Sequence, residues 1–308
     1  QLLGTRDNLE WILGAYYFNE DGVNVNTLDF TVSNFRSGGS FDNEAWAIFA
    51  QGTYDLSDAL HLTLGGRYTD EQKSFTPDQI IYQNYYAGFS SLVPADNPLA
   101  ALDAPFLQAG GRILPLLEKD IDISEFTPMA NLSYDLSDDI MVYLSYSEGF
   151  KSGGFTQRVF PPIVPPFTAP PGTADIDLIP TYDPEFVEVL ELGFKGTFAD
   201  GRIRLNGALF STDYEDLQVQ VFNSVAPVTQ NIGKASIEGI ELELLASPGR
   251  GWLVESSVAL IDASYDEIDT SNTLIGRNND FERVPEVTAS LGLSREMSLG
   301  DSGTLIVR

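Results

Sequence analysis

Hydrophobic and polar residues alternate along most of this chain, and the stretch 140–150 has the clearest pattern. A period of two is that of a β-strand, whose successive side chains point to opposite faces. A short turn precedes this stretch, and a glycine- and proline-rich stretch follows it. Such a strand is typical of the wall of a transmembrane β-barrel. Its apolar set is Ile140, Val142, Leu144 and Tyr146, opposite Tyr143, Ser145 and Ser147.

The same alternation predicts about ten full strands and a remnant of another at the C-terminal end. The turn Ala199-Asp200-Gly201 is a strong hairpin signal. Two other turns share nearly one text, TYDLSDAL at 53–60 and SYDLSDDI at 133–140, which we interpret as one turn solution used twice. The predicted strands are 9–17, 45–56, 60–70, 123–136, 140–150, 186–198, 202–222, 234–246, 252–265 and 284–295, with the remnant at 304–308.

Short and long connections alternate between these strands. We expect short turns after residues 56, 136, 198, 246 and 297, and longer connections after 18, 75, 152, 222 and 268. Strands that meander up and down through a membrane give this pattern, whereas a sandwich with Greek-key connections has no reason to. The predicted fold class is therefore all-β, an antiparallel up-and-down transmembrane β-barrel. Because the chain starts at Gln1 without a signal peptide and stops within a strand, we expect a fragment that is open at both ends.

The long connections lack a sustained period. We predict a polar, glycine-rich loop with extended pieces over 19–42, an irregular loop over 75–120 with a short helix at 107–117, and a stiff proline-rich loop over 160–171. A polyproline ligand for a partner domain is the alternative for the last of these. A structureless connection as long as 75–120 argues against a compact soluble domain.

The two faces of the predicted strands differ in chemistry. Burying a basic side chain in lipid near the midplane costs roughly 2–4 kcal/mol, and the alternation avoids that cost. Glu188 is the exception on the outward face, and we place it near an interface. We expect the outward set to face lipid: Leu62, Leu64, Val142, Leu144, Leu190, Leu192, Leu205 and Leu209. The expected inward charges are Arg67, Glu191, Lys195, Arg202, Arg204, Glu241, Glu243, Glu255 and Glu286.

Composition narrows the function. With 45 acidic and 17 basic side chains, a net charge of −28, the chain would be repelled by phosphate backbones, so we expect no nucleic-acid partner. The absence of cysteine removes disulfides, thiolate nucleophiles and cysteine-ligated metals. No apolar run approaches the roughly 18–20 residues of a membrane helix.

Candidate sites are few. We interpret the single histidine, His61, as a strand-face residue, with a Ser-His-Asp triad as the alternative. The stretch 149–154 lacks the ending of a phosphate-binding loop, and nothing selects a carboxylate pair for glycoside hydrolysis. We therefore predict no catalytic, cofactor-binding or metal-binding residues and no cofactor. Three acidic groups are expected to be a solvated rim, with a bound cation as the alternative: Asp262, Asp266, Glu267 and Asp269; Asp175 and Asp177; Asp120 and Asp122.

Several segments together resemble the barrel of TonB-dependent outer-membrane receptors, in the family's order and over most of the chain. Among them are AIFAQGTYDLSDALHLTLGGRYTDE at 47–71, YLSYSEGFKSGGF at 143–155, YDPEFVEVLELGFKGTFADGRIRLNGALFSTDYEDLQVQ at 182–220, NIGKASIEGIELELLASP at 231–248, ASYDE at 263–267 and RVPEVTASLGL at 283–293.

This resemblance implies a barrel of about 22 strands with a plugged lumen, energy from the TonB–ExbB–ExbD complex, and uptake of a ferric siderophore or another large scarce nutrient. It places the protein among outer-membrane lipids of a Gram-negative bacterium. No plug domain or TonB box is visible, and the last barrel strands are missing, so we expect 1–308 to be a partial barrel domain. Its edges should be the strand 9–17 and the strand 284–295 or 304–308. Ligand contacts in the family lie on plug apices and variable loops, so no substrate-binding residue is carried over.

Two other functions stay open. A passive porin-like channel would lack the plug, and the coding sequence upstream of Gln1 would tell it from a receptor. A soluble β-rich carbohydrate-binding or hydrolytic domain would bury its apolar faces between layers and need no detergent.

Overall fold

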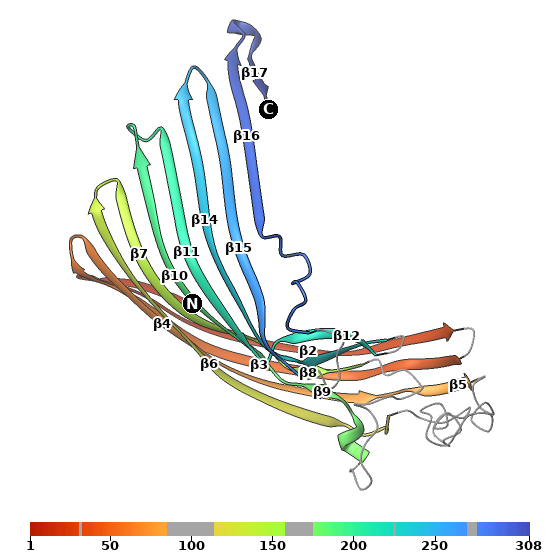
Figure 1. Ribbon diagram of the computed structural model, residues 1–308. Helices are drawn as coiled ribbons and strands as arrows, with labels where there is room; N and C mark the ends of the chain where they lie inside the picture. Colours follow the sequence, from red (N-terminus) through yellow and green to blue (C-terminus); the bar gives the residue numbers. More distant parts are fainter. Residues whose placement is uncertain (31–32, 85–113, 158–174, 224–225, 270–275) are drawn as a thin grey trace.

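A computed structural model of the chain describes residues 1–30, 33–84, 114–157, 175–223, 226–269 and 276–308. Its main feature is one curved antiparallel sheet of 13 strands that does not close on itself (Figure 1). Twelve strands follow one another along the sheet in chain order, apart from the small strands that lie outside this path. This order confirms the predicted up-and-down meander. No helix in the described ranges is long and apolar enough to cross a membrane.

The path of the sheet is β1 (Leu2–Arg6), β2 (Leu9–Phe30), β3 (Ser33–Ser57), β4 (Leu60–Pro77), β6 (Lys119–Ser137), β7 (Ile140–Lys151), β10 (Glu185–Phe198), β11 (Ile203–Glu215), β14 (Gly233–Gly249), β15 (Trp252–Ile268), β16 (Val287–Ser298) and β17 (Thr304–Val307). The short strand β5 (Ile80–Asn84) pairs with β3 beside this path. Two small sheets lie outside it: β8 (Gly154–Phe155) with β9 (Thr181–Tyr182), and β12 (Gln218–Asn223) with β13 (Ala226–Asn231). The described residues also contain two 3₁₀ turns, η4 (Asp175–Leu178) and η5 (Gly300–Ser302).

The two ends of the strands differ, and we name them by their connections. The turn side carries tight turns such as 58–59, 138–139 and 250–251, and the loop side carries the long connections (Figure 1). The predicted hairpin turn at 199–201 is confirmed there: Ala199, Asp200 and Gly201 all have positive φ, of 56°, 57° and 82°. Glycine adopts such φ values without steric cost, which explains its place at the end of the turn.

The sequence prediction was wrong about the N-terminal edge of the sheet. The strand 9–17 is not an edge, because β1 pairs with its beginning through Leu2 to Arg6. β1 has only five residues, too few for a pattern of alternation to stand out. At the other end β17 is the last strand, which confirms one of the two predicted C-terminal edges.

The stretch 19–42, predicted as a loop with extended pieces, is extended throughout its described residues. β2 and β3 remain paired from Leu9↔Tyr54 to Phe30↔Ser33, so this stretch is a long hairpin that extends beyond the neighbouring strands (Figure 1). Backbone hydrogen bonds continue along the whole hairpin, and they hold it without a sustained alternation of apolar and polar residues.

Three further predictions concern residues at the ends of the regular strands or in the connections between them. β11 stops at Glu215, and Asp216, with φ of 53°, separates it from β12, so the predicted strand 202–222 is two strands. Most of the predicted helix 107–117 lies outside the described residues, and its described end, 114–117, is not helical. The proline-rich loop 160–171 lies wholly outside them.

A belt of apolar side chains runs across the convex, outward face of the sheet. Of the eight predicted outward residues, Leu64, Leu144, Leu190, Leu192 and Leu209 are 47–54% exposed and the other three are partly exposed. On β3 the belt runs from Tyr54 to Trp46, roughly 26 Å along the strand, close to the apolar band of about 25 Å on membrane barrels. Aromatic side chains mark both limits. They are Tyr54, Tyr134, Phe198 and Trp252 toward the turn side, and Tyr17, Trp46, Tyr68, Phe126 and Tyr146 toward the loop side.

The next outward position beyond the loop-side limit is polar on strand after strand. Glu188 is one of these residues: it pairs in register with Glu148 on β7 and Asp213 on β11. Its position supports the predicted place of Glu188 at an interface. The others are Asn19, Glu44, Asp70, Ser124, Ser211, Glu238 and Asp262.

A small hydrophobic core lies on the concave face at the loop side. Phe35, Phe75 and Ile123 point inward from β3, β4 and β6 and are 1–6% exposed. The chain returning over them adds Ile179, which is fully buried, and Phe155, whose ring lies 5.5 Å from that of Phe75. Burying one such side chain contributes about 1.5–3 kcal/mol, so this core fixes the segments that cover the wall.

Candidate functional site: the inner wall and the mouth

The inner wall carries a polar hollow midway along the strands. It has a volume of about 440 Å³ and is lined in part by Tyr143, Glu191 and Lys195 from β7 and β10. The Tyr143 hydroxyl donates to Glu191 Oε1 at 2.5 Å, and the Lys195 ammonium lies 5.6 Å from the centre of the Tyr143 ring. Glu191 and Lys195, both predicted as inward charges, therefore contact the same side chain, that of Tyr143.

Tyr143 fits against the wall because a glycine faces it. Gly193 is its cross-strand partner, and a Cβ at Gly193 would come within 2.4 Å of the ring. The ring therefore occupies the space that any side chain at this position would need. Arg67 lies on the same inward face, with its Nε donating to Thr69 Oγ1 at 3.0 Å and its guanidinium 5.7 Å from the centre of the Tyr16 ring.

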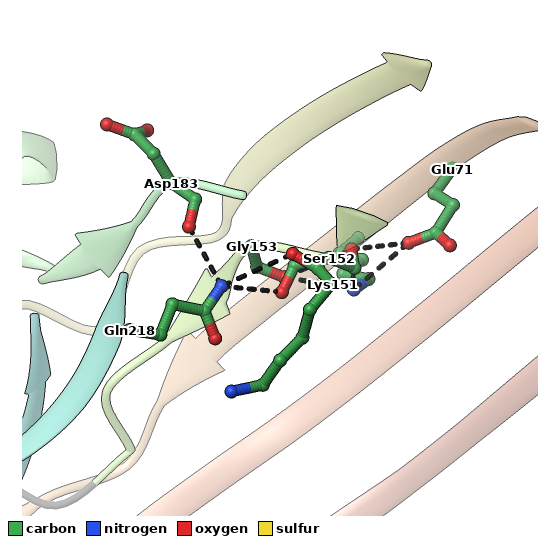
Figure 2. Close-up of polar contacts among 7 residues, drawn as sticks. Glu71, Lys151, Ser152, Gly153, Asp183 and Gln218 are labelled. Carbon is green, nitrogen blue, oxygen red and sulfur yellow. Dashed lines mark hydrogen bonds and ion pairs between the residues drawn. The ribbon is translucent and has the colours of Figure 1, made fainter. Parts of the chain in front are cut away.

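Nearer the loop side than this hollow lies a set of polar contacts, made by Lys73, Glu71, Ser152, Gln218 and Asn231, that we call the mouth network. Its first part joins β4 to the chain that leaves β7 (Figure 2). The Lys73 ammonium donates to Ser152 Oγ at 2.5 Å and to the Gly153 carbonyl at 2.9 Å, and it lies 3.1 Å from Glu71 Oε2. The Ser152 hydroxyl in turn donates to Glu71 Oε2 at 2.5 Å. The Lys73 and Glu71 side chains are only 20% and 17% exposed, so this charged group is partly shielded from water.

The second part is the side chain of Gln218 at the start of β12. Its amide nitrogen donates to three carbonyl oxygens, of Lys151 at 3.3 Å, Ser152 at 3.1 Å and Asp183 at 2.9 Å (Figure 2). One amide thus holds the chain that leaves β7 and the chain that enters β10 together.

Asn231 repeats this arrangement at the end of β13. Its amide nitrogen donates to the carbonyls of Asp183 at 2.9 Å and Asp216 at 2.7 Å, and its Oδ1 accepts from the Asp183 N–H at 2.8 Å. Gln218 and Asn231 are cross-strand partners at the base of the β12–β13 hairpin. The hairpin is therefore moored at its base by two amide side chains.

His61 lies at the turn side, one position beyond the aromatic limit at Tyr54. Its Nδ1 lies 2.6 Å from Asp55 Oδ1 and its Nε2 lies 3.2 Å from Asp135 Oδ2. Hydrogen bonds to the two carboxylates raise the pKa of His61 above 6.5. The two aspartates occupy the same position in the two turn repeats, TYDLSDAL and SYDLSDDI. The strand-face interpretation of His61 is confirmed, and since both ring nitrogens face carboxylates, no serine triad is built on it.

The predicted acidic groups are dispersed over the loop side. Asp262 lies on the outward face of β15, while Asp266 accepts from Ser236 at 3.3 Å near the end of the same strand. Asp175 and Asp177 lie in η4, and Asp120 and Asp122 lie near the start of β6. Over the described residues, no three histidine, aspartate or glutamate side chains converge on one point that could hold a metal ion.

Sequence reasoning missed the mouth network. Gln218 and Asn231 carry no pattern, because a single amide that bonds to backbone carbonyls leaves no trace in periodicity. One signal was available. Near the turn side and midway along the strands, the inward positions are mostly polar. Toward the loop side, however, β3, β4 and β6 place the apolar residues Phe35, Phe75 and Ile123 on the inward face. This change from polar to apolar inward residues indicates that another segment of the protein covers the inner wall there.

Comparison with known proteins agrees with this architecture. A family model described as "TonB dependent receptor-like, beta-barrel" matches residues 1–304. The ferric-pyoverdine 358 receptor of Pseudomonas putida is 26% identical over 233 residues, which are 74% of this chain and 21% of that protein. A probable TonB-dependent siderophore receptor, PiuA, from Acinetobacter baumannii is 26% identical over 117 residues, 35% of this chain and 15% of that protein.

Solved structures share the fold. The ferric yersiniabactin uptake receptor FyuA from Yersinia pestis superposes with a TM-score of 0.71 at 19% identity, over 99% of this chain and 39% of that one. The ferric-catecholate import receptor Fiu from E. coli K12 gives 0.60 at 16% identity, over 97% and 41%.

The chain thus spans about a fifth of the first relative and about two fifths of these solved structures. Members of this family are transport receptors of the Gram-negative outer membrane, which agrees with the apolar belt, the two aromatic limits and the meander. The chain belongs to the family of TonB-dependent receptor β-barrels.

Proposed function

We propose that this chain is part of the wall of an outer-membrane receptor that imports a ferric siderophore. The match of residues 1–304 to the receptor barrel carries the proposal, and receptors for ferric pyoverdine among the relatives support the substrate class. The rest of a longer receptor would supply the remaining strands and a plug, and the plug would contact TonB, driven by ExbB and ExbD. Outer-membrane lipid would surround the belt. We infer no enzymatic role for the chain.

The mouth network supports a receptor over a passive channel. The segments 152–157 and 175–185 pack on the wall and carry buried residues such as Thr156 and Ile179, and the β12–β13 hairpin is moored beside them. A wide aqueous pore needs an unobstructed lumen, whereas a receptor needs a shaped surface that contacts its ligand before import.

The dependence on energy tests the proposal. The complete gene would be expressed in iron-starved cells that lack their own siderophore receptors, with and without TonB, and uptake of ⁵⁵Fe-labelled siderophores would be measured. We expect uptake only when TonB is present. Equal uptake without TonB would favour the porin-like channel.

A further inference from the structure

The sheet has a gap between β6 and β7 on the loop side. Starting from the turn that joins them, these two strands are paired as far as Met129↔Ser147. Beyond that point, among the described residues, β7 is paired with β10 alone, and β6 continues to Lys119 paired with β4 alone. The part of β6 from Lys119 to Pro128 is therefore a strand edge without a partner strand on one side.

The pairing with β4 determines which backbone groups face this gap. The Asp135 N–H donates to the Ala59 carbonyl at 2.8 Å, just before β4 begins, and alternate residues of an antiparallel strand point their N–H and C=O groups to the same side. The register of β6 against β4 continues without a bulge. Odd-numbered residues of β6 therefore hydrogen-bond to β4, and even-numbered residues face the gap. The latter are Asp120, Asp122, Ser124, Phe126 and Pro128.

Pro128 stands where the pairing with β7 ends. Proline has no N–H, and because its backbone faces the gap it removes no hydrogen bond from the pairing with β4. Among the described residues, the backbone N–H and C=O groups of the other even-numbered residues, from Asp120 to Phe126, have no hydrogen-bond partner across the gap. An unpaired edge of this kind is a template on which another strand can pair.

A cleft lies along this edge. It has a volume of about 460 Å³ and is bounded by residues 121–125 of β6 on one side and by residues 181–184 on the other. The mouth network holds the second side in place through Asp183. Ser124 is the first polar outward position beyond the aromatic limit at Phe126, so the cleft lies outside the lipid belt. The free N–H and C=O groups therefore meet water there, which lipid could not replace.

The side chains of β6 define the sequence pattern of a matching strand. Asp120 and Asp122 are exposed on the outward face, whereas Ile121 and Ile123 are half-buried and buried on the inward face. Residues directly opposite one another in an antiparallel pair share a face, and opposite charges across such a pair are favourable. A matching strand would therefore carry basic residues opposite the two aspartates and apolar residues between them.

We propose that the edge of β6 from Asp120 to Phe126 is a docking site for an extended peptide segment of a partner protein, which adds to the sheet as an antiparallel strand. The long loops of such barrels face the cell exterior, so the partner is a protein at the cell surface. Main-chain hydrogen bonds supply the affinity, and basic side chains opposite Asp120 and Asp122 supply the specificity. The site goes beyond the proposed uptake function and does not depend on it.

Peptides methylated on alternate backbone nitrogens test the strand addition. The probe is a fluorescent heptapeptide of alternating lysine and valine, titrated onto the detergent-solubilised complete receptor while fluorescence anisotropy is recorded. In the proposed pairing the lysine N–H groups face β6, and the valine N–H groups face away from it. N-methylation of the lysines should weaken binding by about tenfold or more, because the hydrogen bonds to β6 are lost. N-methylation of the valines should leave binding unchanged.

The two methylated peptides carry the same charge, so nonspecific attraction to the acidic receptor affects both equally. Equal binding of the two would overturn the proposal, and so would a failure of the unmodified heptapeptide to bind. Neither result would bear on siderophore uptake, which is measured separately.

A proline substitution locates the site on β6. Asp122→Pro removes one N–H that faces the gap, and Pro128 shows that the strand accommodates proline on that side. Asp122→Ala is the matched control, because it removes the same carboxylate and keeps the N–H. The heptapeptide should bind the proline variant about two- to tenfold more weakly than the alanine variant. Heat-modifiable mobility on gels would verify that both barrels are folded, and equal binding by the two folded variants would overturn the assignment of the edge.

Discussion

Replacing Gln218 with glutamate should release the β12–β13 hairpin from the wall. The amide of Gln218 donates to the carbonyls of Lys151, Ser152 and Asp183, and a carboxylate can donate to none of them. The new charge would also be carried by the residue whose backbone N–H donates to Glu185 Oε2 at 2.6 Å. The variant therefore replaces attraction with repulsion at the base of the hairpin.

The size of the effect follows from the two N–H groups of the amide. Each hydrogen bond contributes about 0.5–1.5 kcal/mol net, and water can reach these partly exposed carbonyls, so we expect the free energy of local opening to fall by about 1–2 kcal/mol. Amide hydrogen exchange in residues 218–231 should become roughly 5- to 30-fold faster, since 1.4 kcal/mol corresponds to a factor of ten in the opening equilibrium.

The measurement is hydrogen exchange by mass spectrometry on the detergent-solubilised receptor. Gln220→Glu is the matched control: it makes the same chemical change on an exposed side chain two positions along β12, and exchange should keep its original rate. If Gln218→Glu and Gln220→Glu give the same exchange in 218–231, then Gln218 does not moor the hairpin.

Three other outcomes are expected. The His61 ring should titrate above pH 6.5 by NMR, and Asp135→Asn should lower its pKa. Because the folded-state pKa is raised, the stabilisation by His61 is fully present below about pH 6.5 and is lost as the pH rises through the raised value, so an unshifted titration would contradict the contact. Gly193→Val should displace the Tyr143 ring and destabilise the barrel by about 1–3 kcal/mol, measured from the urea midpoint against wild type; an unchanged midpoint would mean that the ring moves freely. A spin label at position 192 should be quenched by oxygen in lipid and shielded from aqueous nickel chelates, and the reverse would place Leu192 in the lumen.

The sequence predicted the membrane-facing part of this fold because two different solvents act on it there. Lipid on one side and a polar lumen on the other impose alternation, so hairpins such as 186–198 with 203–215 could be placed from Leu190, Leu192 and Leu209 alone. Beyond the belt lipid no longer covers the outward face, so the outward positions need not be apolar and the alternation is lost. The extended β2–β3 hairpin was missed for that reason, although its backbone pairing continues without a break to Phe30↔Ser33.

The candidate site was less predictable, because its contacts are between side chains and backbone. Tertiary folding brings Gln218 to the carbonyls of residues 151–152 and 183, and no local pattern encodes the identity of those acceptors. The role of His61 was partly within reach. Its two carboxylate partners stand at equal positions in a repeated turn text, but only the pairing of β4 with β3 and β6 brings them to one ring.

Along β4 the large apolar side chains lie on the outward face near the turn side and on the inward face near the loop side. This difference affects how such receptors can diverge. Leu64 and Tyr68 point outward near the turn side and middle of this strand, while Phe75 points inward near its loop-side end. A single inserted residue between Tyr68 and Phe75 would leave the lipid-facing positions in place but turn Phe75 out to water. The strand thus has two independently mutable halves. Insertions and deletions near the loop side can reshape the ligand chamber while membrane insertion is preserved, so new substrates can be explored on an unchanged wall.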